Sequence, residues 1–176
     1  MNLLELKQEK RFLGLEFLTW VWYQSEINSG LLNVPGHGPV EIWFEDKMVL
    51  ESGSGDARQT VTCQGRNLDL VEARTALREG KKVSQARLRL AYESREWRVT
   101  VKAEGLELTG IKPPPTLDPS EEEPDGLMGR MLERLAGLRE LTGLLDCLFK
   151  QFLALRLTGD WNGKELPRLR KWLKEQ

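Results

Sequence analysis

Residues with catalytic or metal-binding chemistry are few in this sequence and lie far apart. His37 is the only histidine, and it lies inside the run Pro-Gly-His-Gly-Pro, a composition typical of a turn. One histidine cannot build a histidine-rich metal site, and a triad of serine, histidine and acid would depend on this single residue. We therefore expect His37 to be a turn residue without a catalytic role.

The other candidates for chemistry also favour structural explanations. The glycine-rich loop around Ser54 lacks the Gly-Lys-Ser/Thr ending of a phosphate-binding loop and precedes a predicted strand. The acidic run 121–123 could hold magnesium only if it were fixed rigidly, and it lies in a proline-rich stretch. Cys63 and Cys147 have no Cys-x-x-Cys spacing, so we predict two buried free thiols. We expect no catalytic residue, metal site or cofactor, and predict that the chain is not an enzyme.

Positive charge is the feature that points to a partner. Segments 83–93 and 95–103 alternate apolar and polar residues as β-strands do, and a short charged turn joins them into a hairpin. Basic side chains on the outward face of this hairpin could follow a phosphate backbone. The alternative is an ordinary solvated sheet face, partly neutralised by Glu93, Glu96 and Glu107. The candidate DNA contacts on and beside the hairpin are Arg66, Lys81, Lys82, Arg87, Arg89, Arg98 and Lys102.

A second basic group lies at the C-terminal end of the sequence. The segment 163–176 predicts a short amphipathic helix with leucines and Trp172 on one side and basic residues on the other. Three interpretations stay open for it: a nucleic-acid contact, a helix on a membrane surface, or a cap that docks its leucines on the core. Docking is the commonest outcome for such a helix. Its exposed basic residues, which could extend the hairpin surface, are Arg168, Arg170, Lys171 and Lys174.

The elements that would position these residues indicate an α+β fold with an antiparallel sheet. The run 12–28 is apolar nearly all round, which predicts a buried N-terminal helix that ends at Gly30. Its aromatic residues have no Lys or Arg among them, so packing is favoured over stacking on bases. A middle helix is expected over 69–79. Strands are expected at 40–46 and 47–52, joined as a hairpin, and at 59–65, 83–93, 95–103 and 106–112.

The last third of the chain is predicted to be helical and to follow a linker. Residues 113–126 contain five prolines and five acidic residues, a composition that cannot bury enough apolar surface to fold. We therefore expect an α+β domain over 1–112, an exposed linker over 113–126, and a helical segment over 127–176. The helical segment would form one long helix or two helices broken near Gly143, and would pack on the first domain or on a partner subunit.

Composition and charge restrict the class of protein. With 176 residues and 40% hydrophobic content, the chain can bury an ordinary core. No apolar run approaches the roughly 20 residues that span a bilayer, and the first ten residues are too charged for a signal peptide, so we predict a cytoplasmic protein without membrane contact. The net charge of −1 hides an uneven distribution. Residues 66–112 and 127–176 each carry a net charge of +4, and residues 113–126 carry −5.

Three segments resemble, in order and spacing, the C-terminal half of the recombination-associated protein RdgC family. They are LGLEFLTWVWYQSE, EARTALREGKKVSQARLRLAYESREWRVTVKAEGLELTGIK and ELTGLLDCLFKQFLALR. The most specific part is a helix that ends in Glu-Gly-Lys and is followed by the strand Val83–Tyr92, a turn and two further strands. The resemblance covers most of residues 12–158.

The resemblance implies a non-enzymatic, bacterial, nucleoid-associated DNA-binding protein that modulates recombination or replication by occupying DNA. Family members bind with little sequence preference and form ring-shaped homodimers around duplex DNA. This sequence matches only half of such a ring subunit, and the family tends to be lysine-rich before the middle helix, where Arg66 is the one cation here. The alternative function is a protein-interaction or dimerisation module that does not bind DNA.

Overall fold

The computed structural model describes residues 3–53, 57–65, 70–114 and 124–174. These residues form an α+β fold with an antiparallel sheet, as the sequence predicted. The helices are α1 (Leu3–Ile27), α2 (Leu70–Arg78), α3 (Pro124–Arg156) and α4 (Leu166–Lys174), with short turns η2 (Glu104–Leu106) and η3 (Trp161–Glu165). The strands are β1 (Leu31–Val34), β2 (Gly38–Ser52), β3 (Gln59–Gln64), β4 (Lys82–Tyr92), β5 (Arg95–Lys102) and β6 (Glu107–Lys112).

The sheet has the strand order β1-β2-β4-β5-β6, and β3 pairs with the second half of β2. The β4–β5 hairpin confirms the predicted alternation, because Leu88 lies opposite Val99 and Leu90 lies opposite Trp97. All four side chains are at most 1% exposed. The basic residues between them therefore point to the other face of the sheet.

The predicted hairpin over 40–52 is wrong, because these residues form the single long strand β2. The charged residues Glu45, Asp46 and Lys47, which the sequence suggested as a turn, lie where the register between β2 and β4 shifts between Phe44 and Met48. The shift is a bulge in β2, which bends a strand without ending it. The actual turn comes earlier, where β1 pairs with the start of β2 around His37.

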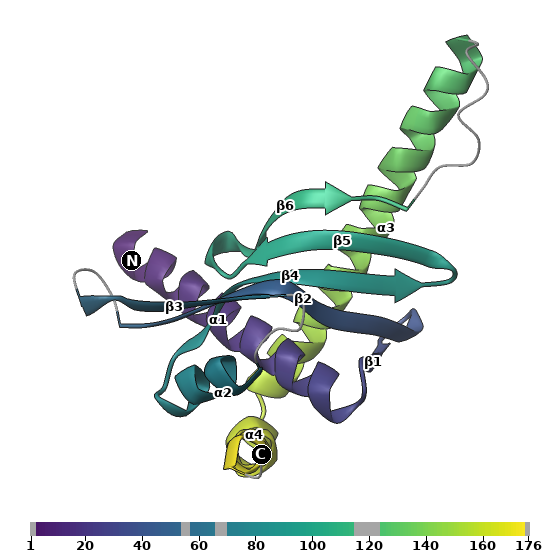
Figure 1. The fold of residues 1–176 in the computed structure, drawn as a ribbon. Helices are drawn as coiled ribbons and strands as arrows, with labels where there is room; N and C mark the ends of the chain where they lie inside the picture. Colours follow the sequence, from purple (N-terminus) through teal and green to yellow (C-terminus); the bar gives the residue numbers. More distant parts are fainter. Residues whose placement is uncertain (1–2, 54–56, 66–69, 115–123, 175–176) are drawn as a thin grey trace.

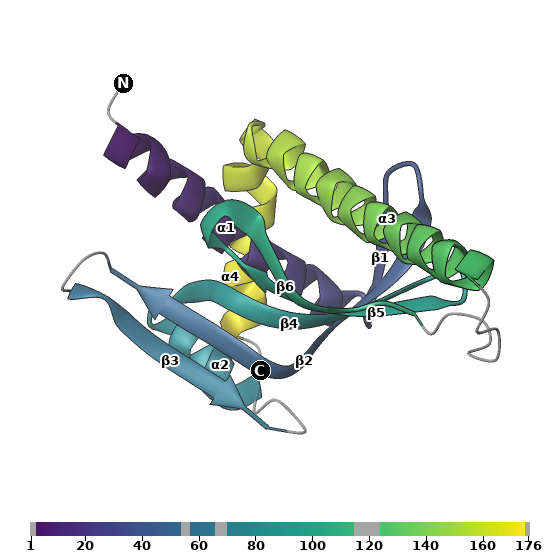
Figure 2. The ribbon, with the colours of Figure 1, turned by 90° about the horizontal axis from the view of Figure 1, so that it is seen from above.

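The described helices lie on one face of the sheet, and none of them covers the other face, which we call the open face. Figure 1 shows α1 and α2 on the same side of the sheet, with α4 beyond them. Figure 2 shows α1 and α3 on one side of the strands. Helix α3 is continuous through Gly143 and begins at Pro124, so the last residues of the predicted linker belong to it. Its second half packs on the first domain, since Leu148 and Phe152 are buried in the same core as Phe17 of α1.

Helix α1 approaches the end of β5 so closely that only glycine fits at the contact. A Cβ atom added at Gly14 would lie 2.0 Å from the carbonyl oxygen of Ala103. Backbone atoms cannot move away as a flexible side chain can. The position of α1 against β5 and η2 therefore depends on this glycine.

We predict that Gly14→Ala lowers the free energy of unfolding by about 1–3 kcal/mol, the usual cost of overpacking. Gly129→Ala is the matched control, because Gly129 is a helical glycine of α3 with no atom within 4 Å of an added Cβ. The control should gain up to about 1 kcal/mol through better helix propensity. Urea unfolding measures both variants, and equal stability of the two would contradict the close contact.

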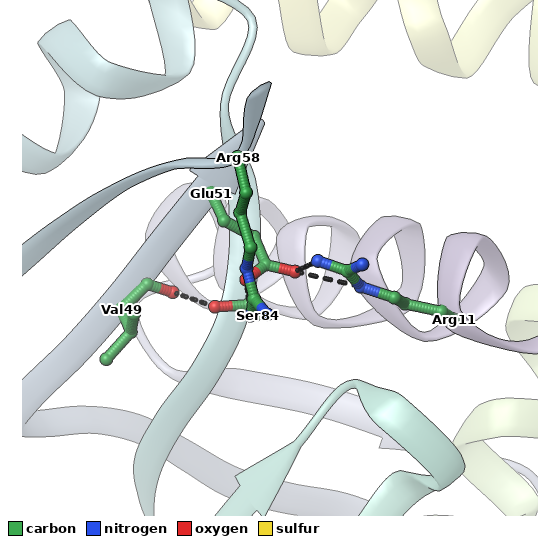
Figure 3. Close-up of polar contacts among 5 residues, drawn as sticks. All are labelled: Arg11, Val49, Glu51, Arg58 and Ser84. Atoms are coloured by element: carbon green, nitrogen blue, oxygen red, sulfur yellow. Dashed lines mark hydrogen bonds and ion pairs between the residues drawn. The ribbon is translucent and has the colours of Figure 1, made fainter. Parts of the chain in front are cut away.

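A buried carboxylate links the first half of α1 to the sheet. Glu51 at the end of β2 is 2% exposed and accepts hydrogen bonds from Arg11 of α1, at 3.1 Å from Nε, and from Arg58, at 2.9 Å from Nε (Figure 3). Burial alone would raise the pKa of Glu51, but the hydrogen bonds and charges of Arg11 and Arg58 outweigh it and hold the pKa below its usual range. In Figure 3, Ser84 of β4 also bonds the Val49 carbonyl beside this cluster.

We predict that Glu51→Gln destabilises the protein at pH 7 by about 1–3 kcal/mol, because two guanidinium groups lose a charged acceptor. The pKa of Glu51 is lowered in the folded state, so its contribution is complete above the unfolded pKa of about 4.3 and is lost as the pH falls toward the folded value. Thermal unfolding from pH 7 to pH 3 should show the difference between wild type and variant shrinking as the pH falls. A difference independent of pH would contradict the ionised cluster.

Candidate nucleic-acid interface

The open face of the sheet brings together four of the predicted DNA contacts. Arg87 and Arg89 of β4 lie beside Arg98 and Lys102 of β5, and Arg89 is directly opposite Arg98 in the register. Like charges directly opposite one another destabilise a sheet unless other groups compensate. The structure therefore confirms that these cations share a face. Because they repel one another there, we expect acidic groups nearby that offset the repulsion.

Carboxylates compensate each of these four cations. Glu45, which the β2 bulge carries, lies 3.5 Å from Arg87 Nε and 3.0 Å from Arg98 Nε. Glu96 lies 3.5 Å from Arg89 Nη1 and 3.0 Å from Arg98 Nη2. Two further acidic residues, Asp46 and Glu107, pair with Arg87 and Lys102.

This pairing changes what the open face can bind. The four cations and their four carboxylate partners cancel in formal charge, so the surface does not present the net positive potential that attracts a phosphate backbone. A phosphate would have to displace a carboxylate that is already in place. Exposed ion pairs of this kind are weak, at about 0–1 kcal/mol each, so the exchange is feasible but gives little net attraction.

The other predicted contacts lie away from the open face or outside the described residues. Lys81 is 7% exposed and bonds Glu79. Lys82 lies over the Phe12 ring, 4.0 Å from its centroid, and pairs with Glu16 of α1. Both lysines are thus held by neighbouring protein groups. Arg66 lies outside the residues that the structure describes.

Helix α4 carries a second group of cations in a different setting. Its apolar side is docked, because Leu169, Trp172 and Leu173 are buried, which confirms the docking interpretation for this segment. Its other side exposes Arg168, Arg170 and Lys174. Among the described residues, no carboxylate forms an ion pair with these three side chains, in contrast to the hairpin cations.

Aromatic contacts fix the orientation of α4. The Trp172 ring packs edge-on against Trp22, at 5.7 Å between centroids, and against Tyr23, at 5.4 Å. Burial and the nearby Glu165 raise the pKa of Tyr23, although Arg168 opposes this shift. Helix α4 docks on the helical layer (Figure 1), whereas the hairpin cations lie on the open face, on the opposite side of the sheet. They cannot form one continuous basic face.

The groups with catalytic potential are dispersed. In the described part of the chain, no three His, Cys, Asp or Glu side chains come close enough to hold a metal ion, and residues 54–56 and 121–123 lie outside it. His37 is a turn residue whose ring packs on Tyr92. Cys63 is a buried cysteine outside any disulfide, as predicted, whereas Cys147 is only half-buried. No helix in the described ranges is long and apolar enough to cross a bilayer.

One surface feature was missed at the level of sequence. The first half of α3 exposes Met128, Met131, Leu132 and Leu135, each more than half accessible. Their spacing of three, four and seven residues is visible in the sequence, which left open whether this segment packs on the first domain or on a partner subunit. Periodicity shows that residues share a helix face, and only the structure shows that none of the described residues covers this one.

We predict that Trp172→Ala costs about 3 kcal/mol of stability, as is usual for a buried tryptophan, and releases α4 from the helical layer. Trypsin should then cleave within α4 well before the rest of the folded chain. Leu157→Ala is the control, because Leu157 is 86% exposed and its loss should change stability by less than about 0.5 kcal/mol. If Trp172→Ala left α4 as resistant as wild type, the docking contact would not hold the helix.

Comparison with models of known protein families gave no match, and comparison with curated proteins gave none either. The RdgC resemblance therefore stays a prediction from the three sequence segments that carry it. For this chain, function has to be inferred from the arrangement of its charged and apolar side chains.

Proposed function

We propose that this protein is a non-enzymatic DNA-binding protein that contacts the phosphate backbone through the basic side of α4. The observation that carries the proposal is the set of exposed cations Arg168, Arg170 and Lys174, which have no carboxylate partner among the described residues. Unpaired cations on a docked helix bind phosphates without first giving up a protein partner. Binding of this kind depends on charge and carries little sequence preference.

The hairpin cations support the proposal less well than α4 does. Arg87, Arg89 and Arg98 are each paired with Glu45 or Glu96, so the open sheet face is close to neutral. Association with the nucleoid and a role in recombination or replication follow from the RdgC resemblance alone. Both are part of the proposal only if the chain binds DNA.

We predict micromolar or weaker binding of a fluorescent 20-base-pair duplex at low salt, measured by anisotropy, with affinity falling steeply between about 50 and 200 mM salt. Replacing the three α4 cations with glutamine should weaken binding at least tenfold. The slope of the logarithm of the binding constant against the logarithm of the salt concentration should become less negative by about 0.9 for each phosphate that the variant no longer neutralises. The control replaces three exposed cations elsewhere, so that net charge changes equally: Lys47, Lys112 and Arg134.

A second variant tests the hairpin without changing net charge. The variant removes two arginines together with their carboxylate partners. It carries the four substitutions Arg89→Gln, Glu96→Gln, Arg98→Gln and Glu45→Gln. This variant should bind within about threefold of wild type, because the pairs contribute little net potential. If this hairpin variant lost DNA binding while the α4 variant kept it, the DNA contact would lie on the hairpin instead of on α4. Absence of DNA binding at low salt would exclude the function itself.

The second candidate function is a protein-interaction module, and the exposed apolar face of α3 favours it. Met128, Met131, Leu132 and Leu135 are 61%, 53%, 59% and 59% exposed. Contiguous apolar surface of this kind marks interaction sites in folded proteins. The two functions are compatible, because α3 and α4 present different surfaces. Light scattering separates them: an interaction module assembles whether or not the α4 cations are present.

A further inference from the structure

A small cavity lies between the second half of α1, strand β1 and α3. Its volume is about 260 Å³, and α3 contacts β1 beside it (Figure 2). Residues from all three parts of the chain line the cavity, and no charged side chain is among them. The cavity therefore offers no counter-charge to a phosphate, a carboxylate or an ammonium group, and it suits an uncharged ligand.

The lining combines a buried apolar part with polar side chains at the rim. Trp20, Leu32 and Leu148 form the apolar part, and each is at most 4% exposed. Asn28 and Asn33 are exposed and form the rim. Apolar walls with a few polar groups are the usual lining of a small-molecule site. A sugar would leave hydroxyl groups unpaired against the apolar part, so a flat and largely apolar ring fits better.

One polar atom of the lining is buried without a hydrogen bond. The side-chain oxygen Oε1 of Gln151 has no hydrogen-bond partner among the described residues. The neighbouring amide of Gln24, by contrast, donates to Glu165 and accepts from Asn28. Buried polar atoms are nearly always hydrogen-bonded, so an unpaired one needs an explanation. A ligand in the cavity that donates an N–H or O–H group to Gln151 supplies the missing bond.

Size and hydrogen bonding together indicate a purine base. An engineered protein cavity of roughly 150 Å³ holds benzene, so a volume of about 260 Å³ suits a ligand with two fused rings. A glutamine amide donates and accepts at once, and it forms a pair of hydrogen bonds with the amino group and N7 of adenine. The apolar faces of such a base match the buried apolar part of the lining.

We propose that this cavity binds an adenine base, with Gln151 Oε1 accepting a hydrogen bond from the amino group and Nε2 donating one to a ring nitrogen. The attached sugar leaves the cavity at the rim, where the amides of Asn28 and Asn33 can bond its hydroxyl groups. A free nucleoside and an unpaired adenine in a nucleic-acid strand offer the same base. The proposal does not depend on DNA binding by α4.

Isothermal titration calorimetry of the full chain with adenosine tests the site. We expect a dissociation constant of about 0.1–1 mM, the affinity usual for a ligand of this size. Purine riboside, which lacks the amino group, should bind at least tenfold more weakly because Gln151 Oε1 then stays unpaired.

Gln151→Leu should also weaken adenosine binding at least tenfold. The melting temperature of this variant should not fall, because Gln151 Oε1 has no protein partner to lose among the described residues. Gln59→Leu is the matched control, because Gln59 is exposed on β3, and it should bind adenosine as wild type does.

A DNA duplex with one unpaired adenine distinguishes the two sources of the base. If the base belongs to a nucleic acid, anisotropy should show tighter binding of this duplex than of one with an unpaired purine that lacks the amino group, and Gln151→Leu should abolish the difference. If the source is a free nucleoside, adenosine binds and the two duplexes bind equally.

The proposal is overturned if neither adenosine nor the unpaired adenine binds better than its counterpart without the amino group, since the cavity then holds water alone. It is also overturned if Gln151→Leu keeps that preference. Adenosine binding by a chain that binds no DNA would exclude the proposed function of α4 and leave this site intact.

Discussion

Aromatic side chains in the second half of α1 join the layers of this protein. Trp22 packs on Phe44 of the sheet, at 6.2 Å between ring centroids, and on Trp172 of α4, at 5.7 Å. Phe17 and Trp20 both pack on Phe152 of α3, at 5.7 Å. Aromatic pairs in such geometries add about 0.5–1.5 kcal/mol each beyond the area they bury. The positions of α3 and α4, and so of the surfaces they present, depend on this one block.

Charge is distributed differently on the two sides of the sheet. On the open face, the β2 bulge brings Glu45 between Arg87 and Arg98, so cations that are adjacent in the register are neutralised locally. On the helical side, α4 turns its apolar residues toward Trp22 and leaves Arg170 and Lys174 in solvent. Groups of basic residues can therefore give a neutral surface or an attractive one, depending on where acidic residues from other strands lie.

Local patterns predicted the elements well, and contacts distant in sequence explain the failures. The period-two alternation in Leu88, Leu90 and Val99 marked the hairpin faces correctly, because one buried face imposes that period. The bulge in β2 was mistaken for a turn, since a charged run is equally compatible with both. The pairing of Glu45 with Arg98 joins residues 53 positions apart, and no sequence pattern specifies such a pair. The exposed apolar side chains in the first half of α3 were missed for the same reason, because periodicity shows that residues share a face without showing what covers that face.

Amide hydrogen exchange with and without a 20-base-pair duplex, at low salt, tests most directly whether α4 is the DNA-binding surface. The account predicts that DNA slows exchange in peptides covering Leu166–Lys174, and leaves exchange in peptides covering β4 and β5 unchanged. Slower exchange in the β4–β5 hairpin with unchanged exchange in α4 would contradict this account. Unchanged exchange in both regions at a saturating concentration of DNA would also contradict it.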